Sequence, residues 1–456
     1  MSIWRSSGSR RTAAALVILL GVAVSLAAAE ISLLVATGDV TSTRAVVWAR
    51  GVHPGTLDVV VGAVGGASST RHSLLVTPAR DLTGKLTLTG LAPATRYAVR
   101  VSQGDARAEA EFVSAPAPDV PARVAFLWSG DLGGGGWCRP LDGGYRVFRP
   151  MLERRADFFL FVGDTIYADV PCGKPGVAPG ADFRARTLAE YHARHRYQRE
   201  DPPLQALLRA TSVYAIWDDH EVRNDFSGPH DPLMPTGRQA LLDYWPIAPP
   251  DDEPTRLYRR FRWGRLLEVF ILDTRQYRSL NSESDGPRKT MLGAAQKRWL
   301  LDAVTSSAAV WKVVVTSVSL SIATGRPEAR DSWTGVSPFG LPMDGAGFVA
   351  ERDAILEQLR KHDVKNLVFV TADVHHAEVI RHEPTPGWSF HELVAGPLSA
   401  TMGRPRPLDL TLNPRSLFGR GGVFNFGEIV VEPAGFTVRL IDDSGAVMFT
   451  HTLKPN

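Results

Sequence analysis

The sequence has almost no net charge once its first residues are set aside. It holds 51 Lys and Arg residues against 48 Asp and Glu residues, but Arg5, Arg10 and Arg11 lie within residues 1–29, which contain no acid. The remainder is balanced at 48 of each sign. A neutral chain gives no support for a surface that binds nucleic acid or anionic lipid, so no specific nucleic-acid partner is expected. With 44% hydrophobic and 22% charged residues, the composition is that of an ordinary soluble globular protein.

Long apolar segments are also lacking, with one exception at the N-terminus. The run from Ala13 to Leu26 is too short to cross a bilayer comfortably. It follows Arg10-Arg11 and precedes small residues, so residues 1–29 are predicted to be an export signal, with an uncleaved anchor as the alternative. The twin arginines favour the pathway that exports folded, metal-loaded proteins. We therefore expect a periplasmic or extracellular protein without a stable membrane span after cleavage.

Cysteine is scarce, since Cys138 and Cys172 are the only two. In an oxidising compartment they could form a disulfide between two loops. Two free thiols are the second choice. A metal-bound thiolate comes third, because Asp, Tyr and His side chains supply enough hard ligands for a metal site.

The first part of the chain has strand patterns and no helical pattern. Residues 43–49, 57–62, 84–89 and 96–101 alternate at period two, which predicts a small all-β sandwich over residues 30–117. The segment Gly90–Tyr97 looks like the turn of fibronectin type III domains in which a Leu and a Tyr anchor a corner. Three prolines within residues 115–121 mark a linker.

From residue 118 to residue 456 strands alternate with helical patterns, which predicts an α/β layered domain. Amphipathic spacing predicts helices over residues 147–155, 188–196, 238–244, 293–304 and 347–361. Residues 404–425 are rich in Arg, Pro and Gly and are predicted to be an irregular surface loop. Three strands follow, over residues 426–431, 436–441 and 447–451. There is no internal repeat.

Four apolar strand patterns each end in an aspartate. They lead into Asp131, Asp164, Asp219 and Asp373, and two of them continue to a histidine, His220 or His375. In α/β proteins, binding sites form beyond the carboxyl ends of strands. A single Gly-Asp pair commonly does no more than close a strand, but four such ends predict a metal centre.

A centre of two metal ions needs hard anionic oxygens, one of them bridging, together with imidazoles. Asp164 is the natural bridge. Asp131, Tyr167 and His375 can complete one ion, and a phenolate ligand favours ferric iron. Alone, Tyr167 would more often be a core residue. Asp219 and Asp373 can serve the second ion, for which carboxylates favour calcium, magnesium or manganese over zinc.

The residues after Asp219 are candidates for handling the substrate. His220 could donate a proton to the leaving group, or could instead be a metal ligand. Arg223 and Asn224 could bind a phosphoryl oxygen, although isolated Arg and Asn residues usually lie on the surface. Gly133–Gly136 could leave room for a substrate, and they lack the Lys and the spacing of a nucleotide-binding Walker loop.

Two weaker candidates follow His375. His376 and Glu378 are more typical of supporting positions, since one of two adjacent histidines usually lies behind the ligands.

Taken together, these motifs resemble the PhoD-like alkaline phosphatases, a branch of the calcineurin-like metallophosphoesterases related to purple acid phosphatases. The resemblance covers nearly the whole chain after residue 29. Its motifs are Gly-Asp-Thr-Ile-Tyr-Ala-Asp (163–169), Trp-Asp-Asp-His-Glu-Val-Arg-Asn (217–224), Leu-Asp-Thr-Arg-Gln-Tyr-Arg (272–278), Asp-Ser-Trp-Thr-Gly (331–335) and Ala-Asp-Val-His (372–375).

The resemblance implies a four-layer α/β/β/α sandwich preceded by a fibronectin III-like or Ig-like β-sandwich. It also implies iron at one metal site, with calcium, manganese, zinc or magnesium at the other. Founding members look as though they place a Cys near the position of Asp131, where Ser-Gly-Asp here looks more like the purple acid phosphatase version. Ser317 stands where more distant relatives place a His ligand, which would leave the second ion more open to water.

The resulting expectation is an exported hydrolase that cleaves phosphate monoesters, diesters or both with a metal-bound hydroxide. His220 would assist the leaving group, and no covalent enzyme intermediate is needed. One alternative is a phospholipase-D-like or nuclease phosphodiesterase. An alternative from another class is a non-catalytic surface module with structural metals.

Overall fold

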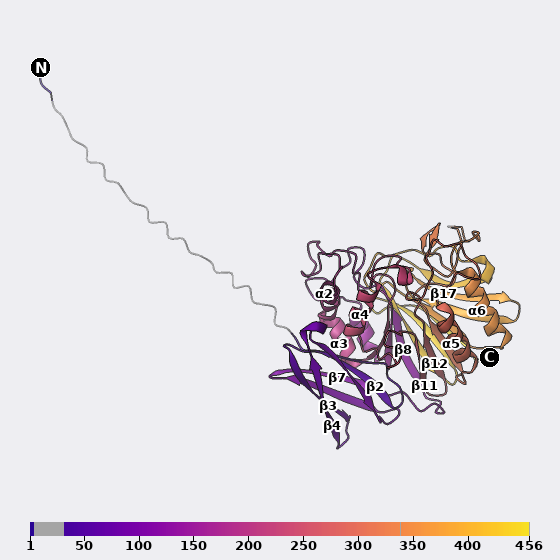
Figure 1. Cartoon of the computed structure of the whole chain (residues 1–456), viewed down its shortest axis with the longest axis horizontal. Helices are drawn as coiled ribbons and strands as arrows, with labels where there is room; N and C mark the ends of the chain where they lie inside the picture. Colours follow the sequence, from indigo (N-terminus) through magenta and orange to yellow (C-terminus); the bar gives the residue numbers. More distant parts are fainter. Residues whose placement is uncertain (4–31, 338, 456) are drawn as a thin grey trace. The chain divides into compact units, whose positions relative to one another are not determined.

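The computed structural model describes residues 1–3, 32–337 and 339–455. The predicted export signal, residues 1–29, lies outside the described residues except for its first three. From Ser32 onwards the chain forms one unit around two large β-sheets (Figure 1). Among the helices that the structure describes, none has both the length and the apolar character needed to cross a bilayer.

The predicted N-terminal sandwich is present and has the strand order of a fibronectin III fold. One layer is β1 (Leu34–Gly38), β2 (Arg44–Arg50) and β5 (Thr83–Thr89). The other layer, in the order β4-β3-β6-β7, consists of β3 (Gly55–Ala63), β4 (Ser69–Val76), β6 (Arg96–Gln103) and β7 (Ala106–Val113). The Tyr97 hydroxyl accepts the Ala92 N–H at 2.8 Å, as the corner motif predicts.

The first layer of the sandwich continues into a larger sheet, because β1 pairs in parallel with β10 at Gly38 and Val213. The resulting nine-stranded sheet has the order β22-β21-β20-β8-β9-β10-β1-β2-β5. Its other members are β8 (Val124–Ser129), β9 (Phe158–Val162), β10 (Ser212–Ile216), β20 (Asn425–Glu432), β21 (Gly435–Asp442) and β22 (Val447–Leu453). The domain boundary at residue 117 stays a prediction, since one sheet includes strands from both sides of it.

The second large sheet has seven strands in the order β11-β12-β13-β16-β18-β17-β19. They are β11 (Arg259–Trp263), β12 (Leu267–Ile271), β13 (Trp311–Val315), β16 (Leu367–Thr371), β17 (Ala377–Thr385), β18 (Trp388–Val394) and β19 (Pro414–Arg420). A short hairpin joins β14 (Gly325–Arg326) to β15 (Ala329–Arg330).

The prediction of an irregular loop over residues 404–425 is wrong in part. A 3₁₀ turn occupies Leu410–Leu412, and β19 pairs antiparallel with β17 at the edge of the sheet. An edge strand needs only one partner, so it can form from a segment of exposed and half-exposed residues without an alternating apolar pattern.

Alternating side chains of the seven-stranded sheet enter two different cores. Val269 and Ile271 of β12 pack into the core that also holds Phe126, Phe158 and other residues of the nine-stranded sheet. Phe270, between them in sequence, packs with residues of α5 (Gly293–Thr305) and α6 (Val349–Lys361). The two sheets therefore face each other, and helices cover the outer face of the second sheet (Figure 1).

Helices of the other flank complete the four-layer α/β/β/α arrangement. They are α1 (Phe148–Glu153), α2 (Leu188–Arg199), α3 (Pro202–Ala210) and α4 (Met234–Tyr244). Of the six α-helices that the structure describes, five were predicted and α3 was missed. Its N-terminus carries two standard signals, an Asp201 side chain that accepts the Leu204 N–H at 2.9 Å and a proline directly after it.

Candidate metal centre

The carboxyl ends of four strands supply the centre. Strands β8, β9 and β10 are parallel neighbours, and the turns after them carry Asp131, Asp164 and Asp219. Asp373 and His375 come from the turn after β16 of the other sheet. Parallel neighbours end at the same edge of a sheet, so the order of strands brings together residues that are far apart in sequence.

The backbone at these turns adopts a conformation that non-glycine residues rarely use. Asp131, Asp164, Asp373 and His375 have φ angles of 64°, 52°, 64° and 61°. Left-handed conformations of such residues cost free energy and cluster at functional sites. The turns therefore sacrifice some local stability, and the side chains that they direct converge.

Within the described residues, the side chains form three overlapping groups suited to metal ions, of which the third is Asp219, Asp225 and Asp331. One ligand atom from each of Asp131, Asp164 and His375 lies within 4.8 Å of the others. The same holds for Asp164, Asp219 and His220. Asp164 belongs to the first two groups, which is the position that a bridging carboxylate needs.

Two carboxylate oxygens in the centre are buried without a hydrogen-bond partner among the described residues. They are Oδ2 of Asp131 and Oδ2 of Asp373. Burial and the neighbouring carboxylates raise the pKa of Asp131, Asp164 and Asp373 well above the ordinary value. Because buried acceptors and like charges are costly unless a cation is present, the donor set fits metal ions.

The second half of the centre has a different electrostatic character. Burial would raise the pKa of the Asp219 carboxyl, but His220 and Arg275 outweigh it and lower this pKa to about 2. Burial would likewise lower the pKa of His220, yet the carboxylates of Asp219 and Asp169 raise it to about 9. His220 therefore favours its protonated form.

Asp169 orients this imidazole, although it had been assigned no role from the sequence. Its Oδ1 lies 2.6 Å from His220 Nδ1, and its Oδ2 accepts the Asn224 N–H at 3.0 Å. The contact occupies Nδ1, so Nε2 is the ring nitrogen left to act in the cavity. Asp169 is the last residue of the Gly-Asp-Thr-Ile-Tyr-Ala-Asp motif, and this position is the sequence feature that could have indicated its role.

Tyr167 lies where the sequence pattern predicts. Its hydroxyl is 3.2 Å from Nε2 of His375, and its ring stacks on His220 with a centroid separation of 4.1 Å. Burial, followed by the charges of Asp164 and Asp131, raises the pKa of Tyr167 well above its usual value. A neighbouring cation would be needed to ionise it.

Glu221 holds the turns in place and was another residue without a predicted role. This buried carboxylate accepts the backbone N–H groups of Thr165, Asp164 and Asp218 at 2.6, 3.2 and 2.9 Å. It thereby ties the turn after β9 to the turn after β10. Residues of this kind have no sequence signal beyond their place in the Asp-Asp-His-Glu motif.

A cavity of about 310 Å³ opens over the centre. It is lined by five residues of the strand-end turns and by seven residues around them. The five are Asp164, Asp219, His220, Asp373 and His375, and the seven are Asn224, Asp225, Thr324, Gly325, Thr401, Gly403 and Arg406. Arg406 is the cavity's one Arg or Lys in this set of described residues, and its Nη1 donates to the Ala323 carbonyl at 2.9 Å.

Arg223 does not line this cavity. Its guanidinium instead forms an ion pair with the buried Asp231. Sequence reasoning favoured Arg223 because of its motif, whereas Arg406 lay in a segment predicted to be an irregular loop. Of the two predicted substrate-binding residues, Asn224 alone lines the cavity.

The glycine loop does not provide the predicted open space. A Cβ atom at Gly134 would meet the Tyr167 ring at 2.3 Å, and one at Gly133 would meet the Gln198 amide at 2.3 Å. The glycines therefore allow close packing behind the ligands rather than room for a substrate. The loop is also fixed by a disulfide between Cys138 and Cys172, the first of the alternatives predicted from the sequence.

Ser317 and His376 support the centre from behind. Ser317 is buried and its hydroxyl donates to Asp218. His376 is also buried, with Nε2 at 2.9 Å from Glu378. Neither residue is among the described residues that line the cavity.

Comparisons with protein-family models assign the chain to a family. A family model described as PhoD-like phosphatase matches residues 126–416, and a model of the N-terminal domain of PhoD-like phosphatases matches residues 19–115. The chain belongs to the PhoD-like phosphatase family. The second match begins inside the predicted export signal, whose cleavage after residue 29 stays a prediction.

A curated relative supports the same family assignment. The chain is 27% identical over 323 residues to alkaline phosphatase D of Bacillus subtilis (strain 168), a match that covers 63% of this chain and 52% of the relative. The chain thus spans about half the length of that curated relative.

Two solved structures share the fold of this PhoD-like chain. A structure of PhoD matches with a TM-score of 0.74 and 20% identity, covering 92% of each chain. A purple acid phosphatase from yellow lupin (Lupinus luteus) seeds matches with a TM-score of 0.65 and 13% identity, covering 93% of this chain and 74% of its own. The predicted combination of a β-sandwich and a layered α/β fold is confirmed.

Proposed function

We propose that this member of the PhoD-like family is an exported, metal-dependent phosphoesterase. It hydrolyses phosphate monoesters, diesters or both, and alkaline phosphatase activity is the type that its family favours. The observation that carries the proposal is the cluster of Asp131, Asp164 and His375 next to Asp164, Asp219 and His220 at an open cavity. Within the described residues, Oδ2 of Asp131 and Oδ2 of Asp373 are buried there without a hydrogen-bond partner. Structural metal sites are usually closed, whereas catalytic sites keep a position open.

The residues divide between two cations. Asp131, Asp164, Tyr167 and His375 would hold iron, the ion that a phenolate favours. Asp164, Asp219 and Asp373 would face calcium, or else manganese, zinc or magnesium, since oxygen ligands suit hard ions. When bound, the two ions supply an acidified water and neutralise phosphoryl charge.

His220 would donate a proton to the departing oxygen. Its position in the cavity wall, its contact with Asp169 at 2.6 Å and a pKa raised to about 9 by Asp219 and Asp169 all favour a charged imidazole. A general acid must carry its proton at the working pH, and the contact with Asp169 favours the protonated imidazole. Asp169 is then a positioning residue that keeps Nε2 directed at the cavity.

Asn224 and Arg406 are suited to bind the phosphoryl oxygens. Both line the cavity, and an Arg side chain can donate two hydrogen bonds to a phosphate. Arg223 is 56% exposed and is drawn towards Asp231, so it would have to leave that ion pair to reach a substrate. We therefore assign the cationic contact to Arg406 first.

Export rests on a separate set of observations. Residues 1–29 have the pattern of a signal, and the Cys138–Cys172 disulfide is typical of an oxidising compartment. The twin arginines favour export in the folded state. Fractionation of the native host tests this, and recovery of the full-length chain in the cytoplasm would contradict it.

The activity is tested with protein purified from its own host, its metal content measured, and chromogenic mono- and diesters as substrates. We expect turnover of at least one ester class, loss of turnover on chelation, and joint loss of activity and metal in Asp164→Asn. The exposed Asp58→Asn is the matched control. Normal metal content and turnover in Asp164→Asn would refute the bridging assignment.

The same assays separate the alternatives. A phospholipase-D-like or nuclease enzyme would cleave lipid or nucleic-acid diesters in preference to small monoesters. A surface module with structural metals would bind metal but turn over none of the esters.

A further inference from the structure

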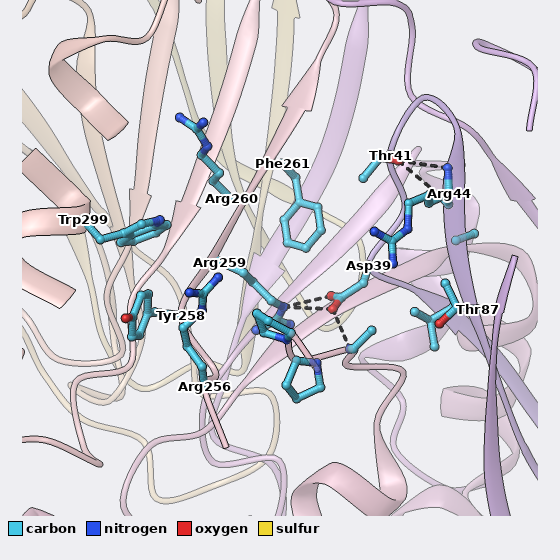
Figure 2. Close-up of a pocket in the computed structure, with 15 residues that line it drawn as sticks. Asp39, Thr41, Arg44, Thr87, Arg256, Tyr258, Arg259, Arg260, Phe261 and Trp299 are labelled. Atoms are coloured by element: carbon cyan, nitrogen blue, oxygen red, sulfur yellow. Dashed lines mark hydrogen bonds and ion pairs between the residues drawn. The ribbon is translucent and has the colours of Figure 1, made fainter. Parts of the chain in front are cut away.

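A second pocket, of about 320 Å³, lies at the junction of the sandwich and the seven-stranded sheet. It is lined by the β1–β2 turn and the start of β2, by Thr87 of β5, by residues 248–250, by residues 256–261 leading into β11, and by Trp299 of α5 (Figure 2). It shares no described lining residue with the catalytic cavity. Its volume lies within the range of pockets for small molecules.

The floor of the pocket is a fixed ion pair. Both carboxylate oxygens of Asp39 accept from Nε of Arg259, at 3.0 and 3.1 Å, and Oδ2 also accepts the Ala248 N–H at 3.0 Å. Arg259 donates further to the carbonyls of Ala215 and Leu257 at 2.7 and 2.8 Å. The one carboxylate that lines the pocket is thus already neutralised by a buried partner.

One wall of the pocket is aromatic. The rings of Tyr258 and Trp299 lie 4.9 Å apart, and Phe261 also lines the pocket. The guanidinium of Arg256 lies 5.1 Å from the Tyr258 ring, and its charge is balanced by an ion pair with Glu253 at 2.9 Å. Trp299 is only half-buried, which leaves part of its ring for a ligand.

The opposite wall carries an uncompensated positive charge. Arg44 is exposed, and its guanidinium forms no ion pair or hydrogen bond to the residues that the structure describes. Figure 2 shows it directed towards the Asp39–Arg259 pair, across from Tyr258 and Trp299. Arg260, by contrast, points away and lies 3.8 Å from Glu268.

We propose that this pocket binds a small anion that carries a ring. The acidic group would pair with Arg44, and the face of the ring would pack on Trp299 and Tyr258. Aromatic rings and sugar rings both stack on tryptophan, so the shared chemistry is a ring beside one acidic group. This site does not rest on the proposed phosphoesterase activity.

The test is a titration of the full chain, followed by ligand-detected nuclear magnetic resonance. Benzoate supplies an aromatic ring with an acidic group, and glucuronate supplies a sugar ring with one. Acetate and benzyl alcohol each lack one of the two features. We expect saturable binding of the first or second probe below about 10 mM, and binding of the other two at least tenfold weaker.

Variants locate the binding. Arg44→Glu and Trp299→Leu should each weaken it at least tenfold, whereas Trp299→Phe, which keeps a ring, should stay within about threefold. Arg71→Glu reverses an exposed charge elsewhere and is the matched control. Asp164→Asn should leave this binding unchanged, which separates the pocket from the catalytic cavity.

Preference for benzoate would assign an aromatic ligand, and preference for glucuronate would assign an acidic sugar. No saturation by either probe, or unchanged binding in Arg44→Glu or Trp299→Leu, would overturn the proposal. Circular dichroism of each variant excludes unfolding as the cause of a loss.

Discussion

Two groups of buried carboxylates lie next to each other in this molecule and differ in what neutralises them. In the metal centre, Asp131 and Asp373 each have a buried oxygen without a hydrogen-bond partner in the part of the chain that the structure describes. In the neighbouring group, the Asp331 carboxylate accepts hydrogen bonds from both Nη atoms of Arg275, at 2.7 and 2.6 Å. It also accepts hydrogen bonds from Arg278 and Asn281, at 2.7 Å each. Oxygens of Asp331 and Asp219 lie within 4.8 Å of each other, so the groups are contiguous.

The difference teaches that burial and residue type alone do not define a metal site. The same aspartate is a structural element where the chain supplies a fixed guanidinium, and a ligand where it does not. A buried charge is strongly destabilising without its partner. The Asp331 network therefore supports the centre without needing an ion, whereas the centre needs an ion to be stable in its ionised form.

The largest expected effect comes from removing the shared ligand. Asp164→Asn should lower turnover by about 10³-fold or more, equivalent to about 4 kcal/mol, and should lower metal content with it. The metal-free variant should melt no lower than the metal-free parent, because one of several repelling carboxylates is gone. Assays, metal analysis and thermal melts check this, and a strongly destabilised metal-free variant would contradict the comparison.

Removing the guanidinium of the neighbouring group should act on stability instead. Arg275→Met leaves the buried Asp218 without its guanidinium partner and Asp331 with Arg278 alone, and should lower the free energy of unfolding by about 3–5 kcal/mol. Arg71→Met breaks an exposed pair with Asp58 and should cost less than about 1 kcal/mol. Denaturant titrations compare the two, and equal losses would show that the buried network contributes little.

The proton donor is tested through the leaving group. His220→Gln should lower the rate by about 10²-fold to 10³-fold for alkyl esters while metal content stays normal. Esters of p-nitrophenol, whose leaving group needs no proton, should lose much less. Asp169→Asn should produce a weaker version of the same pattern, and equal losses for both ester types would reject a role as general acid.

Chelation should change how stability depends on pH. In the metal-free protein, Asp131, Asp164 and Asp373 have raised pKa values, so the folded state holds more protons than the unfolded state. The free energy of unfolding should therefore fall as pH rises above about 4. Bound cations remove this penalty, so the melting temperatures of loaded and metal-free protein should diverge from pH 5 to pH 8 and converge on acidification.

The smallest expected effect is a change in KM, and it tests whether Arg406 or Arg223 contacts the substrate. Arg406→Gln should raise KM about tenfold with little change in kcat, because it lines the cavity. Arg223→Gln should change KM by less than about twofold, because its partner is Asp231. The reverse order, measured with one phosphate ester, would return the substrate contact to Arg223.

The parts of the centre that were predictable are those encoded by strand and turn. Apolar runs ending in Asp131, Asp164 and Asp373 have a local signal, and parallel strands bring their ends together. Helix α3 was missed although Asp201 and the following proline mark its start. The position of β19 depends on its pairing with β17, which no local pattern encodes.

The residues that were not predictable act through distant contacts. Asp169 reaches His220 from 51 positions away, and Glu221 fixes Thr165 from 56. Arg223 was assigned to the substrate because nothing in its motif indicates the ion pair with Asp231. Arg406 enters the cavity from a segment whose composition suggested only an exposed loop.

The strand order also dictates when this protein can fold during synthesis. Strand β8 lies between β9 and β20, and β20 begins about 300 residues further along the chain. Until the ribosome has made β20, one edge of β8 has no partner strand. The turn that carries Asp131 also lacks its final support until then. Such distant pairing slows folding, so the nascent chain must keep its central sheet from aggregating until nearly all of its residues have emerged.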